Sequence, residues 1–175
     1  MPSGNESMLS DSNLIIDEGD LRKRTREWLT EKYRGRFLFE PIILHNLGLT
    51  ISEFLKRKFS GEILSSIPRY NEMNVKPDIF SIVRLERGKL GLVIAECKIN
   101  VGLKDFRQVM DYARTCQCYE AYLAFYGKLS EDVINRIRIK DILYNGLNRY
   151  GEIVSKELVI VEYRGDNTFI IKRKF

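Results

Sequence analysis

The chain has few of the residues that build disulfides or transition-metal sites. Its 175 residues include three cysteines and one histidine. An odd number of cysteines does not form the framework of a disulfide-stabilised secreted domain. A structural zinc site needs four ligands, and only His45 could join the thiols of Cys97, Cys116 and Cys118. We therefore expect neither a disulfide framework nor a metal–thiolate centre.

Long apolar runs and nucleotide-binding motifs are also missing. No stretch approaches the length of a membrane span, and the first residues lack the basic and apolar regions of a signal peptide. Neither G-x-x-x-x-G-K-[ST] nor G-x-G-x-x-G occurs, which argues against a nucleotide-driven motor or a dinucleotide enzyme. The sequence predicts a soluble, cytoplasmic protein that does not bind membranes.

The composition is that of a globular domain with a modest excess of positive charge. Apolar residues make up 44% of the chain, charged residues 30%, and the formal net charge is +5. We expect a polar, flexible tail over residues 1–13 and one domain over residues 14–175. The charge favours a polyanionic partner. Basic residues recur at 22–24, 56–58, 136–140 and 172–174.

Periodicity and capping signals predict helices and strands in alternation. The expected helices are 20–33 after Asp17 or Asp20, 50–59 with the capping box Thr50-Ile51-Ser52-Glu53, 103–116, and 130–147 after Ser130. The expected strands are 62–68, 79–83, 90–95 and 119–126, followed by a hairpin of 158–163 and 168–171. Residues 37–47 are ambiguous, because Pro41 could begin a short helix that Gly48 ends.

Two short motifs carry the chemistry. Pro77-Asp78 precedes the apolar run 79–83, and Glu96-Cys97-Lys98 ends the run that begins at residue 90, eighteen residues after the aspartate. Glu96 and Lys98 are two apart on a predicted strand, so they share one face and Cys97 points to the other. Such charges are costly at an apolar strand unless a charged group lies between them, as a divalent cation and a phosphate would. The competing interpretation is a turn aspartate with a surface salt bridge.

The helix expected at 103–116 adds a second pattern. Leu103, Phe106, Ala113 and others form an apolar stripe at helical spacing. Gln108 and Tyr112 are four residues apart on a neighbouring face. An ordinary amphipathic helix packed on a sheet would also explain these residues.

Together these motifs resemble the PD-(D/E)XK nuclease superfamily, which includes RecB-type nucleases and archaeal Holliday-junction resolvases. The resemblance covers about residues 50–126. It implies an α/β fold with a restriction-endonuclease-like core, in which a central mixed β-sheet is flanked by helices, with N-terminal and C-terminal additions. By analogy, Asp78, Glu96 and the Cys97 carbonyl would bind Mg²⁺, with Mn²⁺ as a substitute, and Lys98 would act on the attacking water and the phosphate charge.

The resemblance implies further site residues. Gln108 and Tyr112 are similar to the Q-x-x-x-Y motif of RecB-type members, which assists substrate binding. Resolvase-like members add a glutamate from the helix before the first strand. Glu53 suits that role by position, although its capping box also explains it. Glu27, Glu40 and His45 are weaker candidates for the same ligand.

The function expected from the resemblance is a Mg²⁺-dependent DNA nuclease, an endonuclease acting on duplex, branched or flap DNA. A different expectation is a nuclease-fold protein that binds nucleic acid without cutting it. A third is a sequence-specific restriction enzyme, for which the short chain leaves little room for a recognition domain. A junction resolvase would need a two-fold homodimer to cut two strands symmetrically.

Overall fold

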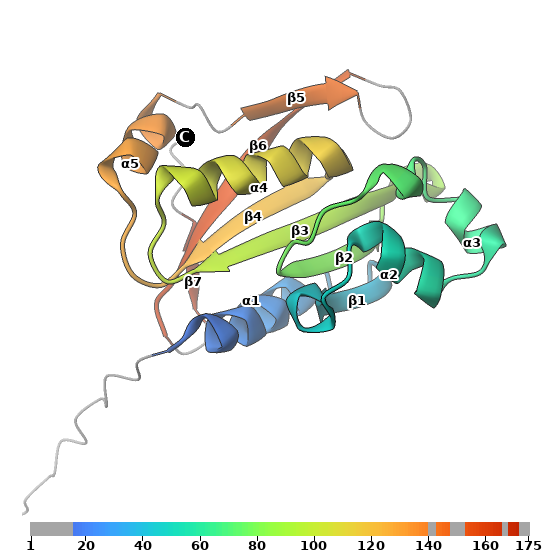
Figure 1. The fold of residues 1–175 in the computed structure, drawn as a ribbon, viewed down its shortest axis with the longest axis horizontal. Coiled ribbons are helices and arrows are strands. Elements are labelled where there is room, and N and C mark those ends of the chain that lie inside the picture. The colour runs from blue at the N-terminus through green and yellow to red at the C-terminus, as the bar shows by residue number, and fades with distance from the viewer. Residues whose placement is uncertain (1–15, 140–142, 148–152, 166–167, 172–175) are drawn as a thin grey trace, which may run out of the picture.

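A mixed β-sheet with helices on both faces forms the centre of the molecule (Figure 1). The computed structural model describes residues 16–139, 143–147, 153–165 and 168–171, so the expected tail at 1–13 lies outside the described residues. The strands are β1 (Phe37–Ile43), β2 (Ile79–Arg84), β3 (Leu90–Lys98), β4 (Glu120–Phe125), β5 (Leu143–Leu147), β6 (Ile153–Tyr163) and β7 (Phe169–Ile171). The helices are α1 (Glu18–Lys32), α2 (Ile51–Lys58), α3 (Gly61–Ser65), α4 (Leu103–Cys116) and α5 (Glu131–Arg138).

The strands have the order β1-β2-β3-β4-β6-β5, and β7 also pairs with β6. β1, β2 and β3 are antiparallel neighbours, whereas β3, β4 and β6 are parallel. β5 and β7 both run antiparallel to β6. Helix α4 makes the crossover that two adjacent parallel strands require. The expected α/β class, with a mixed sheet flanked by helices, is confirmed.

Strand β3 is buried on both faces and separates two hydrophobic cores. Leu92 and Ile94 pack on the face covered by α2 and α4, whereas Val93, Ala95 and Cys97 pack on the face covered by α1. Burial on both sides explains why this strand reads as a continuous apolar run rather than an alternating one. The same alternation places Glu96 and Lys98 on the α4 face.

Helix starts were predicted well because their signals are local. Asp17 caps α1, Thr50 caps α2 through the expected capping box, and Ser130 caps α5. The hairpin of β2 and β3, helix α4, strand β4 and the β6–β7 hairpin also occur as expected. Cys97, Cys116 and Cys118 are all buried, and none forms a disulfide. No helix in the described part of the chain is long and apolar enough to cross a membrane.

The structure assigns the segment that was ambiguous and corrects two expected elements. Residues 37–47 form strand β1 and then a 3₁₀ turn, η1 (Leu44–Leu47), which ends at Gly48 in the left-handed region. Pro41 is tolerated because β1 is an edge strand, and the register shifts on both sides of Phe39. The strand expected at 62–68 is helix α3, and the helix expected at 130–147 ends at Arg138, with β5 occupying its last residues.

Candidate functional site

Asp78 and Glu96 meet at one end of the sheet. The last β2–β3 pair on this side is Ile79 opposite Ala95, so the next positions along the two strands are Asp78 and Glu96. The Asp78 N–H donates to Glu96 Oε1 at 3.2 Å. Both residues are buried, with relative exposures of 4% and 3%. Two buried acids from separate motifs therefore lie side by side.

The Asp78 carboxylate binds groups from three other parts of the chain. Its Oδ2 accepts the Cys97 N–H at 2.8 Å. Its Oδ1 accepts Arg22 Nε of α1 at 2.9 Å, and His45 Nδ1 of η1 lies 3.3 Å from the same oxygen. The His45 N–H also donates to the Asp78 carbonyl at 3.2 Å. These contacts fix Asp78 against β3, α1 and the turn after β1.

Glu96 lies in an environment that disfavours its charge. Burial, and secondly the Asp78 carboxylate, raise the pKa of Glu96 from 4.5 to about 8, while Lys98 opposes the shift. A buried acid with a raised pKa beside a second acid is a frequent feature of functional sites. The uncharged form of Glu96 is therefore favoured up to a higher pH than in an ordinary glutamate.

Cys97 does not have the character of a nucleophile. Its side chain is fully buried against α1, and its Sγ lies 3.5 Å from Thr25 Oγ1. Burial raises the pKa of the Cys97 thiol far above its ordinary value. Because the thiolate is the reactive form, this side chain is inert. Any role of Cys97 at the site belongs to its backbone.

Lys98, Gln108 and Tyr112 belong to the same face of the sheet as Glu96. Lys98 is only partly buried, two residues beyond Glu96 at the end of β3. Gln108 Nε2 donates to Tyr112 Oη at 2.9 Å, so the pair forms one unit on α4. Tyr112 packs against the core that α4 shares with β3. The described contacts of the pair are with each other and with this core, and its role at the site stays a prediction.

The loop after β3 is held by the loop after β4. The Gly127 N–H donates to the Ile99 carbonyl at 2.6 Å, and the Val101 N–H donates to the Lys128 carbonyl at 2.8 Å. Asn100 Oδ1 accepts the Lys128 N–H at 2.9 Å, and a Cβ at Gly127 would lie 2.3 Å from this oxygen. Glycine at 127 thus allows the close packing that supports the end of β3 beside Lys98.

The donor atoms at this end suit an oxygen-binding cation more than a transition metal. In the described residues, no group of three or more His, Cys, Asp or Glu side chains is arranged to hold an ion. Mg²⁺ does not need such a group, because it keeps several waters and binds one or two carboxylates. In an extended strand the N–H and C=O of one residue point to the same side, so the Cys97 carbonyl faces the Asp78 side. Asp78, Glu96 and this carbonyl therefore fit Mg²⁺.

Glu53 does not have the position that was expected of it. Its helix, α2, follows β1, whereas α1 is the helix before the first strand. The Glu53 carboxylate accepts the Thr50 N–H at 2.7 Å, and this bond is the main cause of its lowered pKa. The capping interpretation is confirmed, and a metal-binding role for Glu53 stays an untested prediction.

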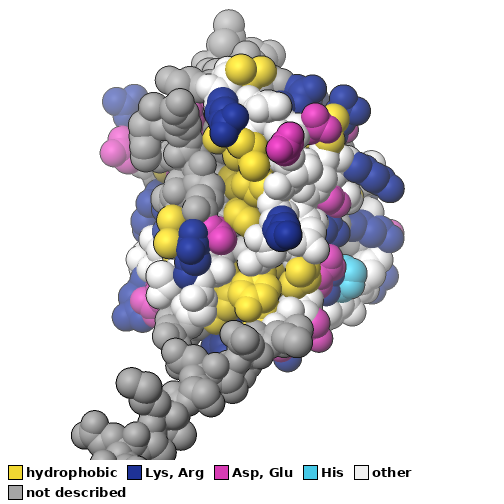
Figure 2. All heavy atoms as spheres, turned by 90° about the vertical axis from the view of Figure 1, so that its left-hand side faces the viewer, with side chains coloured by type: hydrophobic (Ala, Val, Ile, Leu, Met, Phe, Trp, Pro, Cys, Tyr) yellow, Lys and Arg dark blue, Asp and Glu magenta, His cyan; other side chains and the backbone are white. Residues whose placement is uncertain are grey.

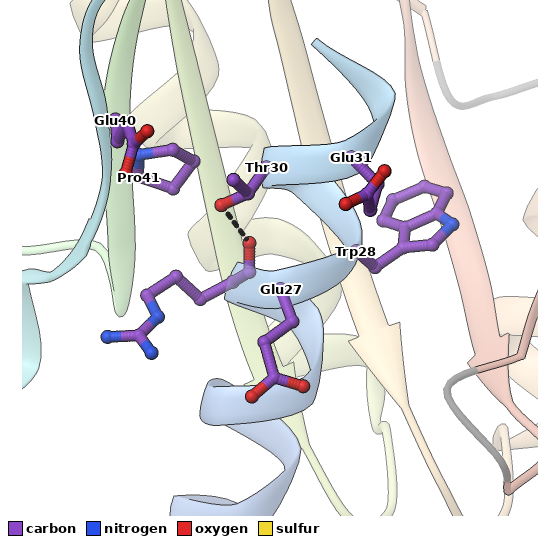
Figure 3. A pocket seen from close by; sticks show the side chains of 7 residues that line it. Glu27, Trp28, Thr30, Glu31, Glu40 and Pro41 are labelled. Atoms are coloured by element: carbon purple, nitrogen blue, oxygen red, sulfur yellow. Dashed lines mark hydrogen bonds between the residues drawn. The ribbon is translucent and has the colours of Figure 1, made fainter. Parts of the chain in front are cut away.

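Glu27 and Glu40 line a different surface. Together with Trp28, Thr30 and Pro41 they border a depression over the outer side of α1 and the edge strand β1 (Figure 3). Neither Asp78 nor Glu96 lines this depression. His45, the remaining weaker candidate, does contact Asp78.

Basic side chains surround this end of the molecule without merging into one patch. Figure 2 views the end to which β3 points, with Lys and Arg side chains scattered among hydrophobic ones and with the single histidine near an edge. The clusters at 22–24 and 56–58 belong to α1 and α2, and Arg136 and Arg138 belong to α5. Residues 140 and 172–174 lie outside the described residues.

Sequence reasoning missed Arg22 as part of the site. In the sequence it is one of several basic residues on the first helix, 56 residues before Asp78. The available signal was its position four residues after Glu18, to which its Nη2 donates at 3.1 Å.

No protein-family model, curated protein or solved structure matches the chain. A functional assignment therefore rests on the site's own residues.

Proposed function

We propose that the protein is a Mg²⁺-dependent DNA endonuclease with a restriction-endonuclease-like core of the PD-(D/E)XK type. The observation that carries the proposal is the buried pair of Asp78 and Glu96 at the end of β2 and β3, with Lys98 on the same face as Glu96. The order α1, β1, β2, β3, α4, β4, with α2 and α3 inserted between β1 and β2, also suits such a core. Duplex, branched and flap DNA are the candidate substrates.

In this proposal Asp78, Glu96 and the Cys97 carbonyl hold the ion. Bound Mg²⁺ supplies a Lewis acid for the phosphate and lowers the pKa of a bound water. The Cys97 N–H keeps Asp78 oriented through Oδ2, and the Asp78 N–H does the same for Glu96. This preorganisation limits the cost of bringing two carboxylates together at the moment of binding.

Lys98 and the polar pair on α4 would act on the substrate. Lys98 is a compact positive charge at an accessible strand end, suited to the phosphate and to orienting the attacking water. Gln108 and Tyr112, already hydrogen bonded to each other, would contact the nucleic acid. The scattered basic side chains favour contacts to backbone phosphates rather than to base edges.

A second candidate is a protein that binds nucleic acid on the same fold without cutting it. The observation that favours it is the Arg22 contact, because a guanidinium already neutralises Asp78. In that case the charged groups around Asp78 would form a buried ion-pair network that ties α1 to the sheet. Such a network would serve structure, with no ion and no hydrolysis.

The test is cleavage of labelled duplex, single-stranded, flap and four-way-junction DNA with Mg²⁺ or Mn²⁺, with EDTA as a blank. Asp78→Asn and Lys98→Ala proteins are compared with wild type. Asp111→Asn is the matched control, because Asp111 is an exposed acid on the outer side of α4. We expect metal-dependent cutting that Asp111→Asn retains and both site variants lose.

Each substrate outcome has a distinct meaning. Cutting of the four-way junction in preference to the others would indicate a resolvase, and sedimentation should then show a homodimer. DNA binding without cutting, unchanged in Asp78→Asn, would favour the second candidate. Cutting that survives in both site variants would disprove the proposed site.

A further inference from the structure

Arg22 binds one of the two carboxylate oxygens of Asp78 that a metal ion could use. Its Nε donates to Asp78 Oδ1 at 2.9 Å, and its side chain is only 12% exposed. The other oxygen, Oδ2, already accepts the Cys97 N–H at 2.8 Å. Both oxygens of Asp78 are therefore engaged by the protein itself.

Arg22 and Mg²⁺ would compete for the negative charge of Asp78 at Oδ1. A magnesium ion binds an oxygen at about 2.0–2.1 Å. With the guanidinium nitrogen 2.9 Å from the same oxygen, the two cations would lie within about 5 Å of each other, where like charges repel strongly in a buried site. Binding of the ion through Oδ1 is therefore expected to displace Arg22.

We propose that Arg22 is a positioning residue that competes with Mg²⁺ for Asp78, holding this carboxylate in the metal-free protein and releasing it when the ion binds. The proposal rests on the proposed function, since it concerns the same metal site. According to this proposal, a residue of α1 outside both sequence motifs lowers the affinity of the site for Mg²⁺.

The surroundings of Arg22 permit a side-chain movement of this kind. Its Nη2 also donates to Glu18 Oε2 at 3.1 Å, and the Glu18 side chain is 39% exposed, so a displaced guanidinium keeps a partner nearer to solvent. Leu21, Thr25 and Leu29 anchor α1 on the sheet with no exposed surface. The helix is therefore fixed, and the change would be confined to the Arg22 side chain.

The experiment measures Mg²⁺ affinity by calorimetric titration of the purified full-length protein. Arg22→Gln removes the competing charge, and Arg22→Lys weakens the competition by replacing a branched guanidinium with a point charge. Arg26→Gln and Arg26→Lys are matched controls, because Arg26 is an exposed arginine one turn along α1. Asp78→Asn identifies binding at the site, and circular dichroism establishes folding of each variant.

We expect Arg22→Gln to bind Mg²⁺ at least about tenfold more tightly than wild type, with Arg22→Lys between them and both Arg26 variants unchanged. Loss of a merely structural ion pair would lower thermal stability without tightening metal binding. If Arg22→Gln does not fold, Arg22→Lys against Arg26→Lys provides the same test.

The failure of this inference is distinguishable from failure of the proposed function. Mg²⁺ binding that is lost in Asp78→Asn but not tightened in either Arg22 variant would overturn the inference alone. Absence of Mg²⁺ binding in every protein, or binding that Asp78→Asn leaves unchanged, would overturn the inference together with the proposed metal site.

Discussion

Magnesium binding is expected to strengthen steeply as the pH rises toward 8, because Glu96 must lose a proton before it can coordinate the ion. Burial and the neighbouring Asp78 raise the pKa of Glu96 to about 8. The apparent affinity is the intrinsic affinity multiplied by the deprotonated fraction. It should therefore fall to about one tenth at pH 7 and about one hundredth at pH 6, with release of nearly one proton per ion bound.

The assay is calorimetric titration with Mg²⁺ between about pH 6 and pH 9, in two buffers of different ionisation enthalpy, which reports the protons released. Glu96→Gln is the matched variant, because its side-chain carbonyl can still accept the Asp78 N–H while its amide stays neutral. We expect weaker binding in this variant and little dependence on pH. Wild-type affinity that stays constant from pH 6 to pH 8 would refute the reasoning.

The same pKa determines how the metal-free protein responds to pH. The folded pKa of Glu96 lies above its ordinary value of 4.5, so the folded state holds a proton that the unfolded state has released. This proton contributes fully to the free energy of unfolding below about pH 4.5. The contribution falls by no more than about 1.4 kcal/mol per pH unit as the pH rises, and it is lost at about pH 8. Glu96→Gln should remove this component from the pH dependence of thermal unfolding.

Three further predictions concern stability, measured by chemical denaturation. Gly91→Ala should destabilise the fold by about 1–3 kcal/mol, because a Cβ would lie 2.7 Å from Tyr119 Cβ; an unchanged midpoint would contradict this packing. Thr50→Ala should cost about 1 kcal/mol through loss of the α2 cap, whereas Ser60→Ala should cost less, because Ser60 makes no side-chain cap bond; equal costs would contradict the capping argument. Leu29→Ala should cost about 2–5 kcal/mol, because the side chain is fully buried, and a cost below about 1 kcal/mol would contradict that burial.

The hairpin of β2 and β3 was predictable because its signals are contained in the hairpin itself. Both strands are apolar runs, and the turn between them, η3 (Glu86–Gly88), contains Gly88 with a φ of 73°. Once these strands pair in register, Asp78 must lie beside Glu96. The central acids of the site thus follow from short-range sequence patterns.

Strand β1 was left ambiguous and helix α3 was mispredicted, because tertiary contacts decide their conformation. β1 contains Pro41 and pairs irregularly, and its extended form depends on β2, which follows about forty residues later in the chain. In α3 and the turn that follows it, the buried residues Leu64 and Ile67 are three apart, a spacing that a short helix shares with irregular structure. Because residues 37–47 were left ambiguous, Glu53 was expected on the helix before the first strand. The first strand is β1, so the helix before it is α1.

The contact between Arg22 and Asp78 is central to the charge of the site, and the two sequence motifs do not predict it. Asp78 and Glu96-Cys97-Lys98 determine where negative charge is concentrated, but not which group neutralises it. In the structure Arg22, 56 residues before Asp78 in the chain, donates a hydrogen bond to its carboxylate. An arginine and a magnesium ion can each neutralise the charge of this carboxylate. The balance between Arg22 and a metal ion at Asp78 therefore distinguishes the proposed metal site from a buried ion pair that serves only structure. If the affinity for Mg²⁺ rises when Arg22 is replaced, then Asp78 and Glu96 bind the ion and Arg22 competes with it.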